Sequence, residues 1–405
     1  MPFFSFRKNV DFRSGNEQAM YNTVADREEK SVLYYQIADI VFESEIVLPS
    51  FENFTTEPKP ADVSLVISKE EAPQGIEVRS SYIIQHKIDG GWFYHAVFDD
   101  QMGLVVSEDY KNLKLVGQRT YSEQAAEDMG FDEEYSLEEV LIRMALECLL
   151  VRHGYVSLHS ACIQLEEQAI AFSGPSGTGK STRAEAWKEA FGAELISGDR
   201  PLINVRNLEV YGVPWDGKEK CFRNVHYPLN TIIEVRRSKK SNYIREMSHE
   251  QKRRLLYQEC FIPMWDTETA VIQMANIAKL ASGAKILRGF SGPCPESAVE
   301  LRKALEAGKY KKEKTDMKAK DGFVLRNIAG EQILMPTDEN IGKFKGTVLL
   351  SGVAAFIWEK MQAPVSRDDL LTAILDEYEV EESVAAKDLD NLLTKLDEYG
   401  VIEKD

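Results

Sequence analysis

An eight-residue run at positions 174–181, GPSGTGKS, matches the pattern Gly-x-x-x-x-Gly-Lys-Ser/Thr. An apolar run at 169–172 predicts a buried strand before it, and residues 180–191 predict a helix after it, which Gly192 ends. Glycines let backbone N–H groups converge on phosphate oxygens, and the start of a helix adds a partial positive charge. A strand, a glycine-rich loop and a helix in this order therefore predict an α/β domain that binds a nucleotide.

The polar side chains of this loop have predicted roles. Lys180 reaches the outer phosphates and the Ser181 hydroxyl ligates Mg²⁺, so ATP and Mg²⁺ are the expected cofactors. The expected nucleotide-binding residues are Gly174, Ser176, Gly177, Thr178, Gly179, Lys180, Ser181 and Thr182. An ordinary GTPase with such a loop carries an Asn-Lys-x-Asp motif that reads the base, and no such motif follows here. The predicted strand and helix on either side argue against a mere glycine-rich turn.

Composition and charge exclude several other classes of protein. The 43% hydrophobic and 28% charged residues are typical of a globular protein, and 405 residues suggest two or three domains. A net charge of −17 repels a phosphate backbone, which argues against nucleic acid as a partner. The five cysteines are scattered without a Cys-x-x-Cys pair, which favours a reducing cytoplasm. We find no signal-peptide pattern and no run of about 18 apolar residues, so we expect neither export nor a membrane partner.

The first predicted unit is a β-rich N-terminal lobe at 1–135. Its clearest element is a hairpin within 82–98, whose two strands are joined by an Asp-Gly-Gly turn. The second predicted unit, 136–308, opens with a helix whose start is marked by a capping box of Ser136 and Glu139. Strands and helices alternate after this helix, which predicts an α/β domain.

A charged segment without apolar periodicity, 309–320, predicts a linker to a third unit at 321–405. The third unit opens with a predicted hairpin of strands within 323–335. Three helical segments follow it, and they start near Ser351, Ser366 and Glu382. The chain is therefore predicted to contain a β-rich lobe, an α/β core and a small C-terminal domain.

Two residues outside the loop lie where phosphate chemistry would need them. His159 lies fifteen residues before the loop, and Asp199 follows an apolar strand after the loop helix. His159, the loop and Asp199 together resemble the catalytic domain of the HPr kinase/phosphorylase family. The sequence YGVPWDGK at 211–218 is similar to that of peptide-modifying relatives, the lasso-peptide kinases. The resemblance covers about 136–308 and implies a P-loop core of the phosphoenolpyruvate-carboxykinase-like type with kinase activity.

The resemblance implies a catalytic set of Asp199, Lys180 and His159. Asp199 corresponds to the second of the family's paired aspartates, the base that takes the acceptor proton and helps Ser181 hold the metal. Gly198 stands in place of the first aspartate, which weighs against bifunctional kinase/phosphorylase behaviour. From the residues alone, Asp199 stays open to a turn-forming role and His159 to a place in the core.

Four arginines near the predicted site are open to two interpretations. They can supply charge to a transition state, or they can form surface ion pairs, which is the more common role of arginine. We therefore leave outside the catalytic set Arg200, Arg223, Arg236 and Arg288.

The C-terminal unit carries a second resemblance. The sequence VLLSGVAAFIWE at 348–359 and the leucine-rich helices after it resemble the PqqD family, named for pyrroloquinoline-quinone biosynthesis protein D. The resemblance implies a winged-helix fold that binds the leader of a precursor peptide as an added strand at 346–350, against the helix at 382–399. From residue 317 to residue 405 there are 10 basic and 18 acidic residues, a balance of −8 that argues against DNA. A packing or dimerisation module without a peptide ligand is the alternative.

These features together predict a cytoplasmic, ATP-dependent kinase of the serine/threonine type. It would phosphorylate a hydroxyl of a ribosomally synthesised precursor peptide while the PqqD-like domain holds the leader. Two alternatives stay open, a kinase of a small molecule or carrier protein and a non-catalytic, nucleotide-gated peptide-binding protein. The expected partner is accordingly a leader peptide or a small protein substrate. Kinases of the resembled family often assemble as rings, so the resemblance also allows a homo-oligomer, which no feature of the sequence shows.

Overall fold

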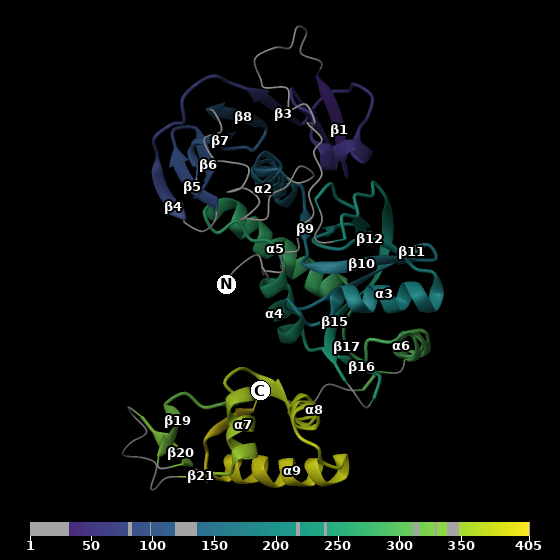
Figure 1. Ribbon diagram of the computed structural model, residues 1–405, viewed down its shortest axis with the longest axis vertical. Coiled ribbons are helices and arrows are strands. Elements are labelled where there is room, and N and C mark those ends of the chain that lie inside the picture. The colour runs from purple at the N-terminus through teal and green to yellow at the C-terminus, as the bar shows by residue number, and fades with distance from the viewer. Residues whose placement is uncertain are drawn as a thin grey trace, which may run out of the picture. The chain divides into compact units, whose positions relative to one another are not determined.

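The computed structural model describes residues 32–79, 83–97, 99–117, 136–215, 219–238, 241–308, 310–311, 316–328, 330–337 and 348–404. The chain forms two compact units, which are coloured from purple to yellow along the sequence in Figure 1. Unit 1 comprises the residues up to Arg236, Met247–Gly289 and Pro293–Lys303. Unit 2 comprises Arg237–Glu246, Phe290–Gly292 and Ala304–Asp405. The predicted mixture of helices and sheets is present in both.

An eight-stranded sheet forms the N-terminal part of unit 1. Its strands are β1 (Leu33–Ile37), β2 (Ile40–Ser44), β3 (Val63–Ile67), β4 (Ile76–Arg79), β5 (Ile83–Ile88), β6 (Gly91–Ala96), β7 (Asp99–Ser107) and β8 (Asn112–Gly117), with a 3-10 helix, η1 (Pro49–Phe54), after β2. They lie in the order β1-β2-β3-β8-β7-β6-β5-β4. The predicted hairpin is confirmed, because β5 and β6 pair antiparallel, and Gly90 between them has a φ of 74° that a turn of this kind requires.

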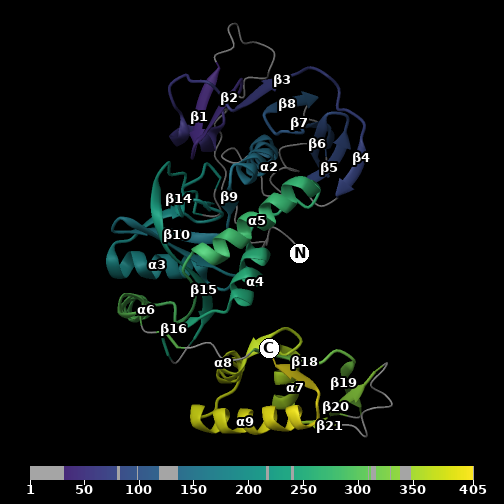
Figure 2. The ribbon, with the colours of Figure 1, turned by 180° about the vertical axis from the view of Figure 1, so that it is seen from behind.

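Helix α2 (Leu137–Arg152) packs on one face of this sheet (Figures 1 and 2). The predicted capping box is confirmed, since the Ser136 hydroxyl accepts from the Glu139 N–H and the Glu139 carboxylate accepts from the Ser136 N–H. The predicted second unit begins with α2, whose apolar residues share one hydrophobic core with those of the eight-stranded sheet and with Tyr155, Leu202 and Trp265 of that predicted unit. The reason is that α2 is buried on nearly all sides and needs the sheet to cover it.

A nine-stranded sheet forms the other core of unit 1. Its strands are β9 (Tyr155–Ser157), β10 (Ser160–Leu165), β11 (Gln168–Ser173), β12 (Glu194–Ser197), β13 (Leu202–Asn204), β14 (Glu209–Tyr211), β15 (His226–Arg237), β16 (Tyr243–Glu246) and β17 (Ile286–Ser291). The main path is β12-β10-β11-β15-β14-β13-β9, and β15 also pairs with β17. β16, which belongs to unit 2, pairs with β17.

Four helices accompany this sheet in the sequence. They are α3 (Lys180–Phe191), α4 (His249–Glu259), α5 (Thr267–Gly283) and α6 (Pro295–Ala307). The predicted loop helix is confirmed as α3, which contacts β10 and β11 and ends at Gly192 with a φ of 68°. Among the helices of the described residues, none is both long and apolar enough to cross a membrane.

Unit 2 is built on two small sheets. Their strands are β18 (Asp316–Ala319), β19 (Phe323–Ile328), β20 (Glu331–Pro336), β21 (Val348–Leu350), β22 (Val365–Ser366) and β23 (Ile402–Lys404), in the orders β22-β18-β23 and β19-β20-β21. Its helices are α7 (Gly352–Lys360), α8 (Arg367–Glu377) and α9 (Glu382–Glu398). The predicted hairpin and three helices are thus confirmed, and Ser351 and Ser366 cap α7 and α8 as their positions suggested.

Part of the predicted linker is a strand instead. Residues 316–319 form β18, the central strand of the sheet β22-β18-β23. Met317 and Ala319 are 8% and 3% exposed and belong to the hydrophobic core of unit 2, which also contains Trp358. The many charges around these two apolar residues concealed the alternation that marks a strand.

Candidate functional site

The directions of three strands bring the predicted site residues to one edge of the nine-stranded sheet. β10 pairs antiparallel with both β11 and β12. β11 and β12 therefore run the same way, and both end at the edge where β10 begins. His159 directly precedes β10, the loop 174–179 follows β11, and Asp199 lies just after β12. Residues that are distant in the sequence thus meet at this edge.

The loop has the backbone conformation that its glycines allow. Gly174, Gly177 and Gly179 have φ angles of 142°, 82° and 96°, which residues with a Cβ rarely adopt. A Cβ at Gly177 would meet nothing within 4 Å, so the loop is open at its middle, whereas a Cβ at Gly179 would lie 2.7 Å from Nη1 of Arg183. Helix α3 begins after Gly179 without a side-chain cap. An open glycine-rich loop before an uncapped helix start fits a phosphate group.

Lys180 is buried at the base of the loop. Its Nζ donates to the carbonyl oxygen of Gly174 at 2.9 Å and lies 3.5 Å from that of Pro175. Burial lowers the pKa of Lys180, and the carboxylates of Glu259 and Asp199 partly oppose this shift. The ammonium group is therefore directed into the loop, where phosphate oxygens would be its acceptors. The other predicted ligands Ser176, Gly177, Ser181 and Thr182 are exposed, and Thr178 is half-buried.

His159 lies between two carboxylates. Its Nδ1 is 2.8 Å from Oε2 of Glu259, and its Nε2 is 4.0 Å from Oδ1 of Asp199. The structure thus places His159 and Asp199 side by side and adds Glu259, which the sequence analysis missed. Glu259 is the last residue of α4, a strongly polar helix, and no motif in the sequence marks it.

Asp199 lies in a tight turn after β12. The Ser197 hydroxyl donates to the Asp199 carbonyl oxygen at 2.7 Å. Arg200 has a φ of 54°, a conformation that costs a residue with a side chain about 1 kcal/mol or more. The Asp199 side chain is 28% exposed and faces His159. Asp199 therefore forms a turn, as one interpretation expected, and also belongs to the cluster beside the loop.

Ion pairs, the expected role of these arginines, are formed by Arg223, Arg236 and Arg288. Arg223 contacts Glu194 at 2.8 Å on the exposed side of β12. Arg236 and Arg288 both contact the buried carboxylate of Glu234, at 2.7 and 2.5 Å. Arg223 thus has a carboxylate partner of its own, whereas Arg236 and Arg288 share the single carboxylate of Glu234.

The predicted metal ligands do not form a cage of their own. In the part of the chain that the structure describes, no three His, Cys, Asp or Glu side chains are placed to hold a metal ion. Ser181 and Asp199 would therefore hold Mg²⁺ only together with phosphate oxygens. This is the usual arrangement for Mg²⁺ at a nucleotide, where one or two protein ligands complement the substrate phosphates.

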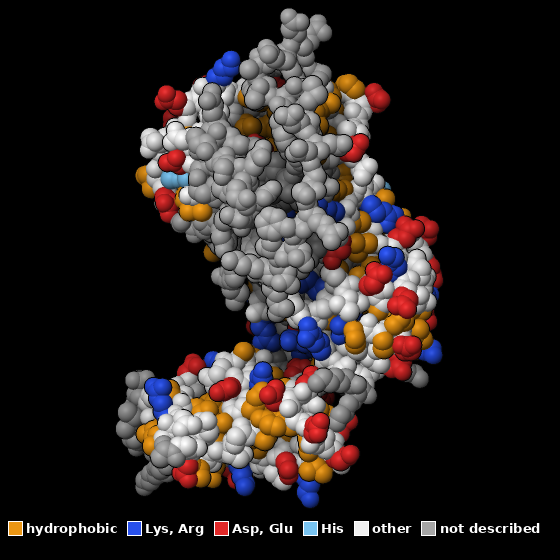
Figure 3. Space-filling model, in the orientation of Figure 1, with side chains coloured by type: hydrophobic (Ala, Val, Ile, Leu, Met, Phe, Trp, Pro, Cys, Tyr) orange, Lys and Arg blue, Asp and Glu red, His pale blue; other side chains and the backbone are white. Residues whose placement is uncertain are grey.

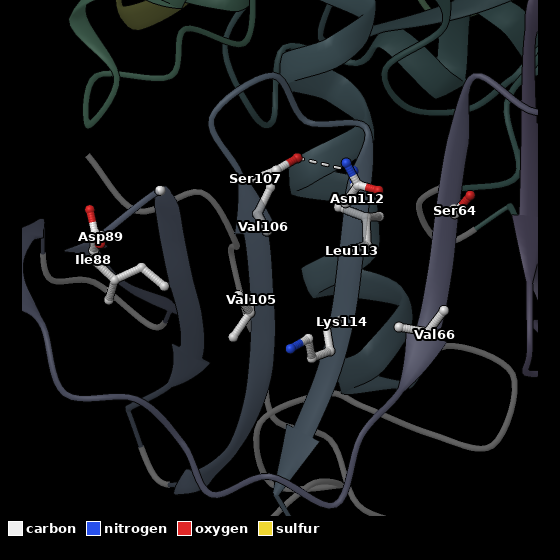
Figure 4. Close-up of a pocket in the computed structure, with 11 residues that line it drawn as sticks. Ser64, Val66, Ile88, Asp89, Val105, Val106, Ser107, Asn112, Leu113 and Lys114 are labelled. Carbon is white, nitrogen blue, oxygen red and sulfur yellow. Dashed lines mark hydrogen bonds between the residues drawn. The ribbon is translucent and has the colours of Figure 1, made fainter.

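A hollow of about 340 Å³ lies elsewhere, on the eight-stranded sheet (Figure 4). It is lined from β3, β7 and β8 by Ser64, Val66, Val105, Ser107, Asn112 and Lys114. The Ser107 hydroxyl accepts from the Asn112 N–H at 3.0 Å at one end of the hollow. None of its lining residues belongs to the predicted site, so the hollow does not bear on phosphate chemistry.

In unit 2, β21 lies at one edge of its three-stranded sheet. Leu349 in the middle of β21 is 62% exposed, whereas Leu350 is 6% exposed and lies in the core. Val384 and Tyr399, at the two ends of the α9 region, are also exposed. Figure 3 shows exposed hydrophobic side chains on this unit with acidic side chains beside them. An edge strand with exposed apolar side chains is a surface to which an extended peptide can add.

Comparison with known proteins identifies the C-terminal domain. The family model described as coenzyme PQQ synthesis protein D (PqqD) matches residues 331–402, so unit 2 contains a PqqD domain. One similar solved structure is TbiB1 in complex with the TbiA(beta) leader peptide, with 23% identity over 21% of this chain and 94% of that chain, and a TM-score of 0.19. Another is lasso peptide synthetase B1 complexed with the leader peptide, with 23% identity over 22% of this chain and 96% of that chain, and a TM-score of 0.19. No curated protein matches the chain.

The family match confirms the PqqD part of the resemblance described above. It covers residues 331–402, and the loop, His159 and Asp199 all lie outside this range. The kinase-like part therefore stays a prediction that rests on the motif and on the geometry of the sheet edge.

Proposed function

We propose that the protein is an ATP-dependent kinase that phosphorylates a Ser or Thr hydroxyl of a ribosomally synthesised precursor peptide. The observation that best supports this is the meeting of the loop, His159 and Asp199 at one sheet edge in a chain that also contains a PqqD domain. The loop offers a place for a nucleotide, Asp199 offers a base beside it, and the PqqD domain offers a place for the leader.

The proposed reaction divides the work between the loop, Lys180, Asp199 and Mg²⁺. The backbone N–H groups of the loop and the Lys180 ammonium bind the phosphates of ATP. Asp199 orients the acceptor hydroxyl and takes its proton as the oxygen bonds to the γ-phosphorus and ADP leaves. Mg²⁺, when bound through Ser181 and Asp199, supplies positive charge to the phosphates. Most of the catalysis would come from positioning and charge stabilisation, as in other phosphoryl transfers.

The leader would add as an extended strand to the edge of β21. Backbone hydrogen bonds would supply affinity, and the exposed apolar side chain of Leu349 would contribute to specificity. Holding the leader raises the local concentration of the acceptor at the site, which for short flexible connections reaches the millimolar range. The PqqD domain would therefore act mainly on KM and not on the chemical step.

Incubation with γ-labelled ATP, Mg²⁺ and a leader-bearing precursor peptide tests the proposal. We expect label on a Ser or Thr of the peptide. Label on a small molecule or a carrier protein would instead show that the protein is a kinase of that substrate, which is the first alternative. Gly198, in place of an aspartate, keeps open the second alternative, a nucleotide-gated peptide-binding protein. ATP-dependent binding of the peptide with no transfer of label would select it.

The first test of the loop is Lys180→Ala. We expect ATP binding or phosphoryl transfer to fall at least about tenfold, because the variant lacks the ammonium group that is directed into the loop. Lys188→Ala is the matched control, since Lys188 lies on the same helix, is 62% exposed and forms a surface ion pair with Glu185. ATP titration and initial-rate kinetics provide the measurement. Unchanged transfer in a folded Lys180→Ala protein would remove the loop from the proposed site.

The leader site is tested by Leu349→Asp. We expect the Kd for the leader to rise at least about tenfold, because a carboxylate in the middle of the edge strand replaces an apolar contact with a charge that must be desolvated. Ile328→Asp is the matched control, since Ile328 is 48% exposed and lies on β19 at the opposite edge of the same sheet. Binding of a fluorescent leader peptide measures both variants. Equal Kd values for the two would place the leader elsewhere.

A further inference from the structure

His159 is held by Glu259 through both backbone and side chain. The His159 N–H donates to the Glu259 carbonyl oxygen at 2.8 Å, and the next hydrogen bond along, from the Phe261 N–H to the Ser157 carbonyl, is 3.0 Å. Leu158 and Cys260 form an antiparallel bridge between these two bonds. Residues 259–261, at the end of α4, thus pair with residues 157–159 as two short antiparallel strands do. This backbone pairing fixes the Cα of His159 relative to that of Glu259.

The side chains complete the arrangement. The Glu259 carboxylate is 5% exposed and lies 2.8 Å from Nδ1 of His159. A carboxylate accepts hydrogen bonds, so this contact suits a tautomer in which Nδ1 is the donor. The other ring nitrogen, Nε2, is then the atom turned towards Asp199, at 4.0 Å. Because Glu259 is buried and His159 stands between it and Asp199, a bound substrate would meet His159 and not Glu259.

We propose that Glu259 is a positioning residue, which fixes the imidazole of His159 with Nδ1 protonated and Nε2 facing Asp199. This inference rests on the proposed function, in which Asp199 is the base. A competing route exists, because the charge of Glu259 also acts on Lys180. The two routes differ in what they require of residue 259. Orientation of His159 requires a hydrogen-bond acceptor, whereas an effect on Lys180 requires a negative charge.

Glu259→Gln and Glu259→Ala separate these routes, because glutamine keeps a carbonyl oxygen that accepts from Nδ1 but has no charge. We expect Glu259→Ala to lower kcat about tenfold or more with little change in KM for ATP, and Glu259→Gln to restore at least about a third of the parent kcat. Glu250→Ala is the matched control at the other, exposed end of α4 and should leave kcat unchanged. Similar losses in both Glu259 variants, with a raised KM for ATP, would overturn the proposal in favour of the effect on Lys180.

A double-mutant cycle with His159→Ala gives a second test. If Glu259 acts through His159, adding Glu259→Ala to His159→Ala should change kcat by less than about twofold. Multiplicative losses of the two single variants would show that Glu259 acts independently, which contradicts the proposal. The unfolding midpoint of each variant should be measured as well, to show that a lower kcat does not come from a loss of folded protein.

The protonation of the ring nitrogens can be read without any assay of phosphoryl transfer. The chain has six histidines, and the ¹⁵N signals of His159 are those lost from the spectrum of His159→Gln. We expect a protonated Nδ1 in the parent protein and in Glu259→Gln, and loss of this preference in Glu259→Ala. An unprotonated Nδ1 in the parent would overturn the proposed orientation. Absence of phosphoryl transfer in the parent would instead contradict the proposed function, and the spectra keep the two failures apart.

Discussion

Replacing Asp199 with asparagine is expected to leave ATP binding nearly intact and to slow phosphoryl transfer about 10²- to 10⁴-fold. The amide has nearly the shape of the carboxylate, so the turn after β12, held by the Ser197 hydroxyl, should keep its conformation. The amide cannot take the acceptor proton, and it offers Mg²⁺ no charge. The loss should therefore lie in kcat, whereas a residue that only shapes the turn would affect the unfolding midpoint and leave kcat unchanged.

Single-turnover kinetics with ATP and precursor peptide, together with an ATP titration, measure this effect. Glu194→Gln is a suitable control, since Glu194 begins the same strand, β12, and is 64% exposed at the end away from the loop. Transfer at the parent rate in Asp199→Asn would show that Asp199 is a turn residue and that the base lies elsewhere.

The second large effect concerns Arg245, which is 1% exposed within unit 2. Its guanidinium donates to the Ser366 hydroxyl at 2.6 Å and to the Asp368 carboxylate at 2.9 Å, at the start of α8. It also lies 4.8 Å from the centre of the Phe290 ring. We expect Arg245→Ala to lower the free energy of unfolding of unit 2 by about 3 kcal/mol, because the variant loses the buried guanidinium that pairs with Asp368, while Asp368, 18% exposed, keeps its 3.4 Å contact with Arg367.

Hydrogen exchange of α7 and α8 at increasing urea concentrations measures this loss for unit 2 alone. Lys318→Ala provides the control, since the ion pair of Lys318 with Asp321 is exposed and should contribute only about 0–1 kcal/mol. A loss for Arg245→Ala no larger than that of the control would show that Arg245 is not required for the stability of unit 2. The same contact means that cutting the chain after residue 312 would leave the buried side chain of Arg245 without Ser366 and Asp368.

Local patterns in the sequence predicted the elements that carry their own signals. The run at 174–181 predicted a phosphate-binding loop, and its neighbours 169–172 and 180–191 predicted a strand and a helix. These two elements are β11 and α3. Ser136 with Glu139 predicted the start of α2 to the residue, and Ser366 predicted that of α8. These signals are reliable because a cap or a glycine-rich loop satisfies backbone groups within a few residues of itself.

Such local patterns could not predict contacts between residues that are distant in the sequence. Glu259 meets His159 across 100 positions of the sequence, and nothing around it distinguishes it from the other acidic residues of the chain. β18 was missed for a related reason, since only Met317 and Ala319 face the core and charged residues surround them. The position of α2 likewise depends on which surfaces cover it, and the sequence of a helix that is buried on nearly all sides does not specify those surfaces.

The division of the chain between its two units has a consequence for synthesis on the ribosome. The backbone passes from one unit to the other five times, at positions 236, 246, 289, 292 and 303, before the PqqD domain begins. Arg245 is therefore made 121 residues before Ser366. At about 5–20 residues per second, this corresponds to about 6–24 s during which the arginine has no partner from α8. Unit 1 can fold during this interval, whereas unit 2 can be completed only after its segment Ala304–Asp405 has been synthesised.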